Sequence, residues 1–476
     1  MTNRAFDELG TWDAVETSAR LRRREVSHRE VLDAALARAE ARAELGAVAA
    51  LSAERARAKA DALASQGQVG AFFGVPTFLK DLAQLEGVQT SWGSEAVTGH
   101  VSRKSDPIAT RMEAIGLSIL GKSQASEFGI TPTTEPKGKP CRNPWNLAHS
   151  TGGSSGGAAA LVASGVVPLA HASDGGGSIR IPASACGLVG HKPSRFVMDM
   201  DGSALLPVNI AVDGVLTRTV RDTVAYFEAM EVLRPASRRA PPLGKVARSP
   251  KRLRMGVYTE SPLGRPVARE PRDAAIAAGE LCASLGHHVE AIAVPFEAAW
   301  LDDFLAYWGF LAWLQIRTAP LMLTRRFDTR RVEGLTSGLA RTFTRNPLEA
   351  ARATARLRGY AAAYAKVFER FDVLITPTMA CLPPELGWIS TEAGFEAWFE
   401  RVKTYVPFTP LQNAAGAPAI SLPLARAENG LPIGVQFAGP FGGDATLLSL
   451  ALELEEAAPW QRVAPGNRAT RGGASS

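Results

Sequence analysis

The chain has 476 residues, of which 46% are hydrophobic and 21% are charged, as in an ordinary globular protein. This composition excludes a disordered, collagen-like or coiled-coil chain, and the length suffices for a large core that no disulfide or metal has to hold together. The formal charge of +6 is small for this length. Its basic clusters, such as residues 22–24, are not interleaved with aromatic side chains, so we expect no nucleic-acid partner.

The cysteines indicate a cytoplasmic protein. The sequence has 4 of them, scattered along the chain without zinc-like spacing, which favours reduced thiols over a disulfide framework. Residues 1–24 are polar and contain no apolar segment of the kind found in a signal peptide. No stretch predicts a transmembrane helix, so we expect no membrane partner, and also no cofactor and no metal.

The predicted elements alternate between helices and strands. Residues 11–64 predict helices, with a capping box formed by Ser27 and Glu30. An apolar strand then runs to residue 79 and is followed by Lys80 and Asp81. Further strands are predicted over residues 117–120, 168–172, 253–258, 288–294, 373–376, 419–422 and 433–437. Further helices are predicted over residues 108–115, 158–164, 271–285, 296–318, 348–370 and 444–457. This alternation is typical of an α/β protein.

Two glycine runs hold the residues of greatest chemical interest, Gly152-Gly-Ser-Ser-Gly-Gly157 and Asp174-Gly-Gly-Gly-Ser178. Neither run is followed by the lysine of a phosphate-binding loop, and a polar loop rather than a strand precedes the first, which argues against a dinucleotide site. Consecutive glycines allow neighbouring N–H groups to point into one concavity. We therefore predict an oxyanion hole formed by the N–H groups of Gly175, Gly176, Gly177 and Ser178, with Ser178 as the nucleophile.

A serine nucleophile needs a base, and none of the 7 histidines stands in a recognisable triad. Lys80 is the alternative, because a lysine at the end of an apolar strand is desolvated and its pKa falls. The pair Ser154-Ser155 could relay a proton between Lys80 and Ser178.

These motifs resemble the amidase signature family. The resemblance rests on both glycine runs, on Ser178-Ile-Arg-Ile-Pro-Ala183, on Cys186-Gly-Leu-Val-Gly-His-Lys-Pro193 and on the later segments 413–423 and 430–439. It implies a Ser–cis-Ser–Lys triad in which Ser178 is the nucleophile, Ser154 follows a cis peptide bond and Lys80 is the base. Ser155, Asp174 and Arg180 are expected to support the loops.

Three positions depart from the usual family pattern. His191 stands where an apolar residue is common, Ser194 where threonine is frequent, and Gly175 where a larger residue is usual. We interpret His191 as a packed core residue. The missing side chain at Gly175 predicts a wider acyl pocket.

Because the similar segments lie on both sides of a variable middle, the resemblance implies one domain over residues 1–476. We divide it into N-terminal helices (1–66), a catalytic core (67–230), a variable substrate-side insert (231–370) and a C-terminal part of the core (371–460). The expected fold is α/β, with a mixed, twisted central sheet flanked by helices on both faces.

The expected activity is hydrolysis of a linear or cyclic carboxylic amide through a seryl acyl-enzyme. Residues 133–136, 142–147, His171 and 181–184 look most like the 6-aminohexanoate cyclic dimer hydrolase branch. Aryl amides, esters and carbamates are further substrates of this scaffold. We expect a small-molecule amide or carbamate substrate and a monomer or homodimer. The alternative is an amidotransferase A-type subunit that supplies ammonia from glutamine within a complex.

Overall fold

A mixed sheet forms the centre of the molecule. The computed structural model describes residues 8–66, 70–234, 239–323, 326–390 and 394–465. Within them an 8-stranded sheet has the order β10-β9-β11-β13-β12-β7-β8-β6. The β10/β9 and β9/β11 pairs are parallel, and the remaining pairs are antiparallel. Its strands are β6 (Leu169–Asp174), β7 (Val189–Lys192), β8 (Val212–Thr217), β9 (Arg254–Val257), β10 (His288–Ala291), β11 (Val373–Pro377), β12 (Ala419–Arg426) and β13 (Pro432–Ala438).

Helices cover both faces of this sheet, which confirms the predicted fold class. Successive residues of a strand point to opposite faces. In β8, Leu216 packs with the alanines of α6, whereas Val215 packs with Tyr226 and Phe227 of α8. The helices are α2 (Ala14–Arg22), α3 (His28–Ala41), α4 (Ala53–Gln66), α5 (Pro107–Ala114), α6 (Gly156–Ala163), α7 (Arg180–Cys186), α8 (Val220–Val232), α9 (Arg269–Ser284), α10 (Ala299–Met322), α11 (Gly334–Arg345), α12 (Pro347–Val367), α13 (Phe395–Tyr405), α14 (Pro410–Ala415) and α15 (Asp444–Ala457).

A small sheet beside the central one carries Lys80. It has the order β1-β3-β2 and is formed by β1 (Val48–Leu51), β2 (Pro76–Lys80) and β3 (Ser118–Ser123). Strand β2 lies next to β6, where Thr77 Oγ1 donates to Leu169 O at 3.1 Å. The end of β2 is thereby fixed against the central sheet. The prediction of a polar loop before the first glycine run is wrong, because a two-stranded antiparallel ribbon, β4 (Arg142–Asn143) and β5 (Asn146–Ser150), precedes it.

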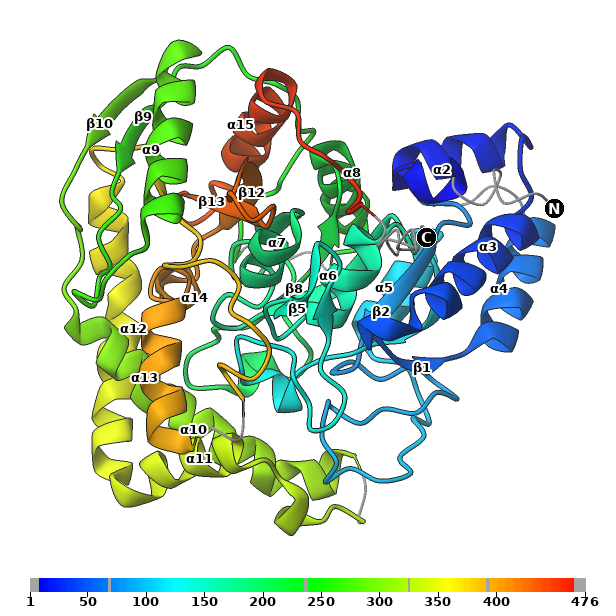
Figure 1. The fold of residues 1–476 in the computed structure, drawn as a ribbon, viewed down its shortest axis with the longest axis horizontal. Helices are drawn as coiled ribbons and strands as arrows, with labels where there is room; N and C mark the ends of the chain where they lie inside the picture. The colour runs from blue at the N-terminus through cyan, green and yellow to red at the C-terminus, as the bar shows by residue number, and fades with distance from the viewer. Residues whose placement is uncertain (1–7, 67–69, 235–238, 324–325, 391–393, 466–476) are drawn as a thin grey trace, which may run out of the picture.

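The N-terminal prediction is right in part. The capping box of Ser27 and Glu30 is present at the start of α3, but the prediction of helix throughout residues 11–64 is wrong at β1. Residues 48–51 form a strand because β3 offers an antiparallel partner, and tertiary pairing overrides the helical preference of alanine and leucine. In Figure 1 the helices α2–α4 lie on the opposite side of the molecule from α9 and α12.

The middle region contributes both to the sheet and to a helical layer. Strands β9 and β10 belong to the central sheet, while α10 packs against α11 and α12 beside it (Figure 1). None of the described helices combines the length and apolar character needed to cross a bilayer.

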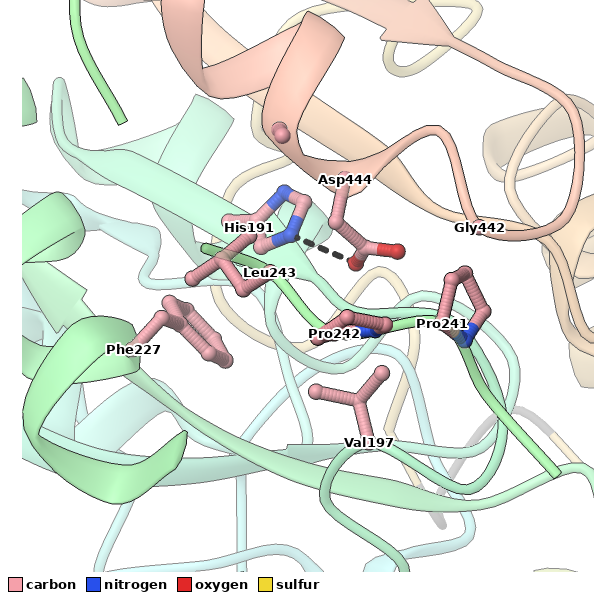
Figure 2. A pocket seen from close by; sticks show the side chains of 9 residues that line it. His191, Val197, Phe227, Pro241, Pro242, Leu243, Gly442 and Asp444 are labelled. Atoms are coloured by element: carbon pink, nitrogen blue, oxygen red, sulfur yellow. Dashed lines mark hydrogen bonds and ion pairs between the residues drawn. The ribbon is translucent and has the colours of Figure 1, made fainter. Parts of the chain in front are cut away.

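His191 is a buried core residue, as the sequence suggested. It lies on β7 with its ring edge-on to Phe227, at 5.0 Å between centroids. Its Nε2 lies 3.1 Å from Asp444 Oδ1, and Figure 2 shows the two side chains in contact. The hydrogen bond explains how an imidazole is accommodated in this apolar layer.

The packing of α6 against the residues next to β3 and β1 depends on the absence of a side chain at Gly157. A Cβ there would lie 2.4 Å from Gln124 N and 2.6 Å from Ala47 O, both backbone atoms. Gly157→Ala should lower the free energy of unfolding by about 1–3 kcal/mol, because the helix must move away from the strand. Urea denaturation measures this loss. Gly359→Ala is the control, since Gly359 is exposed on α12 with open space around it and alanine should stabilise that helix by up to about 1 kcal/mol. Equal effects of the two substitutions would contradict the packing argument.

Candidate active site

Lys80 is fully buried at the end of β2, as its place in the sequence predicted. Its Nζ lies 2.7 Å from Ser154 Oγ and 2.9 Å from Ser173 Oγ. Burial lowers the pKa of Lys80 to about 7, although the carboxylates of Asp174 and Asp213 act to raise it. Near neutral pH a large share of the side chain is therefore a free amine, which can accept a proton.

The first glycine run brings Ser154 to this amine. The Gly153–Ser154 peptide bond is cis, as the resemblance implied. A Cβ at Gly153 would lie 2.6 Å from the backbone carbon of Thr133, so this close approach requires glycine. Ser155 lies one residue further on, and its Oγ donates to Ser173 O at 3.3 Å, which ties the loop to β6.

The second glycine run is shaped by Asp174. Its Oδ1 accepts the N–H of Gly177 at 2.7 Å, and its Oδ2 accepts that of Ile179 at 3.2 Å. Arg180 forms a fully buried ion pair with the same carboxylate at 2.9 Å. Burial alone would raise the pKa of Asp174, but the charge and hydrogen bonds of Arg180 hold it well below its usual range. The carboxylate thus stays ionised, and its hydrogen bonds to the backbone fix the conformation of the glycine loop.

This arrangement corrects one member of the expected oxyanion hole. The N–H of Gly177 donates inward to Asp174, so it does not face a substrate carbonyl. The N–H groups of Gly175, Gly176 and Ser178 are the remaining candidates. All three residues are partly exposed and line the cavity described below.

Residues around α14 clamp this loop from the C-terminal part of the chain. Thr409 Oγ1 donates to Gly176 O at 2.7 Å, and Asn413 Nδ2 donates to Asp174 O at 3.0 Å. Arg180 also donates to Gln412 and Gln436 at 2.9 and 2.8 Å. Sequence reasoning did not assign these roles, although Asn413 begins one of the family-like segments.

Ser173 and Asp213 are also unpredicted members of the site. Ser173 bonds to Lys80 Nζ, and Asp213 lies opposite Ser173 on β8. Neither residue belongs to a motif of its own. The signal was indirect: Ser173 stands immediately before the second glycine run.

A cavity of about 640 Å³ opens onto these groups, and Ser154, Ser173 and Ser178 lie in its wall. The rest of the wall is mostly apolar, and one face of α10 forms part of it. That face contributes Leu301, Phe304, Leu305, Trp308, Leu311 and Leu314. The same helix also belongs to the core, because Trp300 and Tyr307 are buried in a cluster with residues of α12 and α14.

Comparisons with known proteins agree with this geometry. Residues 30–448 match the family model described as Amidase. A Mycobacterium tuberculosis protein that bears the amidase name AmiC is 43% identical over 463 residues, covering 96% of this chain and 97% of its own. The 6-aminohexanoate-cyclic-dimer hydrolase of Paenarthrobacter ureafaciens is 34% identical over 489 residues, covering 96% of this chain and 97% of its own.

A solved structure of 6-aminohexanoate cyclic dimer hydrolase superposes with a TM-score of 0.85 at 32% identity, and the match covers 95% of this chain and 98% of that one. The family match and the relatives both extend over nearly the whole chain. The chain therefore belongs to the amidase signature family and is an enzyme that acts on amide C–N bonds.

Proposed function

We propose that the enzyme hydrolyses carboxylic amides through a seryl acyl-enzyme, with Ser178 as nucleophile, Ser154 as relay and Lys80 as base. The observation that carries this proposal is the buried 2.7 Å contact between Lys80 Nζ and Ser154 Oγ. Ser154 shares the wall of the cavity with Ser178. A largely neutral amine in that position is suited to accept a proton from a hydroxyl.

In the proposed reaction, Lys80 takes a proton from Ser154 while Ser154 takes one from Ser178. The Ser178 oxygen attacks the amide carbonyl, and the N–H groups of Gly175, Gly176 and Ser178 stabilise the oxyanion. The relay then returns a proton to the leaving amine. Water cleaves the acyl-enzyme by the same route in reverse, which regenerates the Ser178 hydroxyl.

The cavity favours an amide with a sizeable apolar portion. Its apolar wall excludes water from a long substrate, and its volume of about 640 Å³ suits a ligand larger than a simple aliphatic amide. The name of the hydrolase relatives supports linear or cyclic aliphatic amides as a first class to test. Aryl amides, esters and carbamates (urethanes) complete the set of proposed substrates.

The sequence also left open an amidotransferase A-type subunit that supplies ammonia from glutamine. Release of ammonia from glutamine, combined with inactivity on plain apolar amides, would favour that alternative.

A cytoplasmic location and a monomer or homodimer stay predictions. The former is supported by Cys141, Cys186, Cys282 and Cys381, all of which are free thiols.

Ser178→Ala should abolish the reaction. Removal of the nucleophile should lower kcat by about 10³-fold or more and prevent covalent labelling by a fluorophosphonate, while thermal unfolding stays close to that of the wild type. Ser164→Ala is the matched control, because Ser164 lies at the far end of α6 and donates to Ala160 O. An active, labelled Ser178→Ala protein would show that another residue is the nucleophile.

The pH profile should report Lys80. Since the neutral amine is the active form and burial places its pKa at about 7, kcat/KM should rise with pH through about 7 and then level off. Lys80→Met should remove this rise and lower the plateau by about 10²- to 10⁴-fold. The measurement is kcat/KM for one amide from pH 5 to 9. A Lys80→Met variant with the wild-type profile would eliminate Lys80 as the base.

Gly175 should determine which substrates fit. Among the described residues, a Cβ at this position would meet Ala211 Cβ alone, at 3.8 Å, so a side chain could extend into the cavity. Gly175→Ile should lower kcat/KM for amides with bulky groups by about tenfold or more and spare small acetyl amides. Gly175→Ala is the control and should change both classes little. A panel that varies the acyl and amine sides independently measures the effect, and an equal loss for all substrates would contradict a steric role.

A further inference from the structure

His171 links the backbone of Lys80 to the carboxylate of Asp213, which has no role in the reaction proposed above. The Lys80 N–H donates to His171 Nδ1 at 3.2 Å, and His171 Nε2 lies 3.1 Å from Asp213 Oδ1. Since Nδ1 accepts a hydrogen bond, it carries no proton, and the proton of the neutral ring is on Nε2. Nε2–H therefore donates to Asp213. The imidazole is fixed in one tautomer by contacts at both nitrogens.

The same carboxylate lies near the side chain of Lys80 as well. Asp213 on β8 stands directly opposite Ser173 on β6, and directly opposite residues of an antiparallel pair point to the same face. Ser173 Oγ lies 2.9 Å from Lys80 Nζ. Asp213 is only 3% exposed, yet it lines the cavity, so its charge acts on the amine through the protein interior, where screening is weak.

We propose that Asp213 and His171 are positioning residues for Lys80: His171 holds the backbone of the strand end that carries the lysine, and Asp213 stabilises the ammonium that forms when Lys80 takes a proton. This inference rests on the proposed role of Lys80 as base. In that step the Ser154 O–H bond breaks and an N–H bond forms at Nζ, so a positive charge appears in a buried site. A carboxylate already in place there favours the charge without rearrangement.

Two other charged groups near Lys80, Asp174 and Lys122, each have an oppositely charged partner. Asp174 forms its ion pair with Arg180 on α7, and Lys122 on the neighbouring strand β3 is paired with Asp81 at 2.9 Å. By contrast, the partner of Asp213 in the described part of the chain is the neutral ring of His171. Among the described residues, no cation is paired with Asp213 in the way that Arg180 is paired with Asp174. This agrees with its effect on the pKa of Lys80, which burial lowers and Asp174 and Asp213 partly restore.

Asp213→Asn tests the electrostatic part of the proposal. Asparagine keeps an acceptor for His171 Nε2–H but removes the charge, so Lys80 should lose its proton more easily and become a weaker base. The rise of kcat/KM with pH should move about one pH unit to lower pH. The plateau should fall about threefold to tenfold. A rise at the wild-type pH would overturn the role of Asp213.

Asp444→Asn is the matched control, because it makes the same change in the buried pair of His191 and Asp444 (Figure 2). That pair has the same 3.1 Å separation and lies on β7 and α15. The control should lower the thermal midpoint without moving the pH at which activity rises. An equal shift in both variants would mean that the shift follows from loosened packing, which would overturn the proposal.

Two variants of His171 test the holding role. The Oδ1 atom of asparagine takes the place of Nδ1, so His171→Asn keeps the acceptor for the Lys80 N–H, while His171→Ala removes it. We expect His171→Ala to lower kcat about tenfold or more with little change in KM, and His171→Asn to recover most of that loss. If His171→Asn is no better than His171→Ala, the holding role is overturned.

The Lys80→Met profile separates failure of this inference from failure of the proposed function. If that variant keeps the wild-type rise with pH, the base is wrongly assigned and the positioning roles are overturned with it. If it loses the rise while Asp213→Asn keeps it at the wild-type pH, the base assignment stands and the role of Asp213 alone is overturned.

Discussion

The site is organised around a primary amine held in the protein interior. A lysine that is cut off from water loses much of its affinity for a proton, and the fully buried Lys80 is stabilised there by two serine hydroxyls. The positions of the neighbouring elements meet this requirement. Strand β2 ends where water is excluded, the loop before α6 brings Ser154 within hydrogen-bonding distance of Lys80, and β6 supplies Ser173.

The buried pair of Asp174 and Arg180 meets a second requirement, which is a fixed shape for the glycine loop. Glycine residues allow backbone N–H groups to point toward one position, but the same flexibility allows many other backbone conformations. Asp174 restricts this flexibility, because its carboxylate accepts hydrogen bonds from the N–H groups on both sides of Ser178. Arg180 then connects this carboxylate to Gln412 and Gln436. The loop and the C-terminal part of the chain are thereby built as one unit.

Much of this arrangement follows from the sequence, and the limits of prediction have physical causes. The fold class, the burial of Lys80 and the closeness of Lys80 to Ser154 could be predicted, because each depends on local pattern or on the family-like motifs. The inward N–H of Gly177 could not, since it depends on where the Asp174 side chain turns. Strand β1 and the pair of His171 and Asp213 were missed for a similar reason: both arise from pairing between segments far apart in the chain.

The structure separates the proposed reacting groups from part of the cavity wall that we expect to contact the substrate. Lys80, Ser154 and Ser178 lie on the sheets and the glycine loops, whereas α10 in the middle region forms one apolar part of the cavity wall. The side chains on one face of this helix can change size without disturbing the hydrogen bonds that hold the amine. Gly175 is the exception, because it belongs to the glycine loop and also leaves space in the cavity. Substrate choice can therefore vary along α10 while the chemistry stays fixed, and the two are coupled most directly at Gly175.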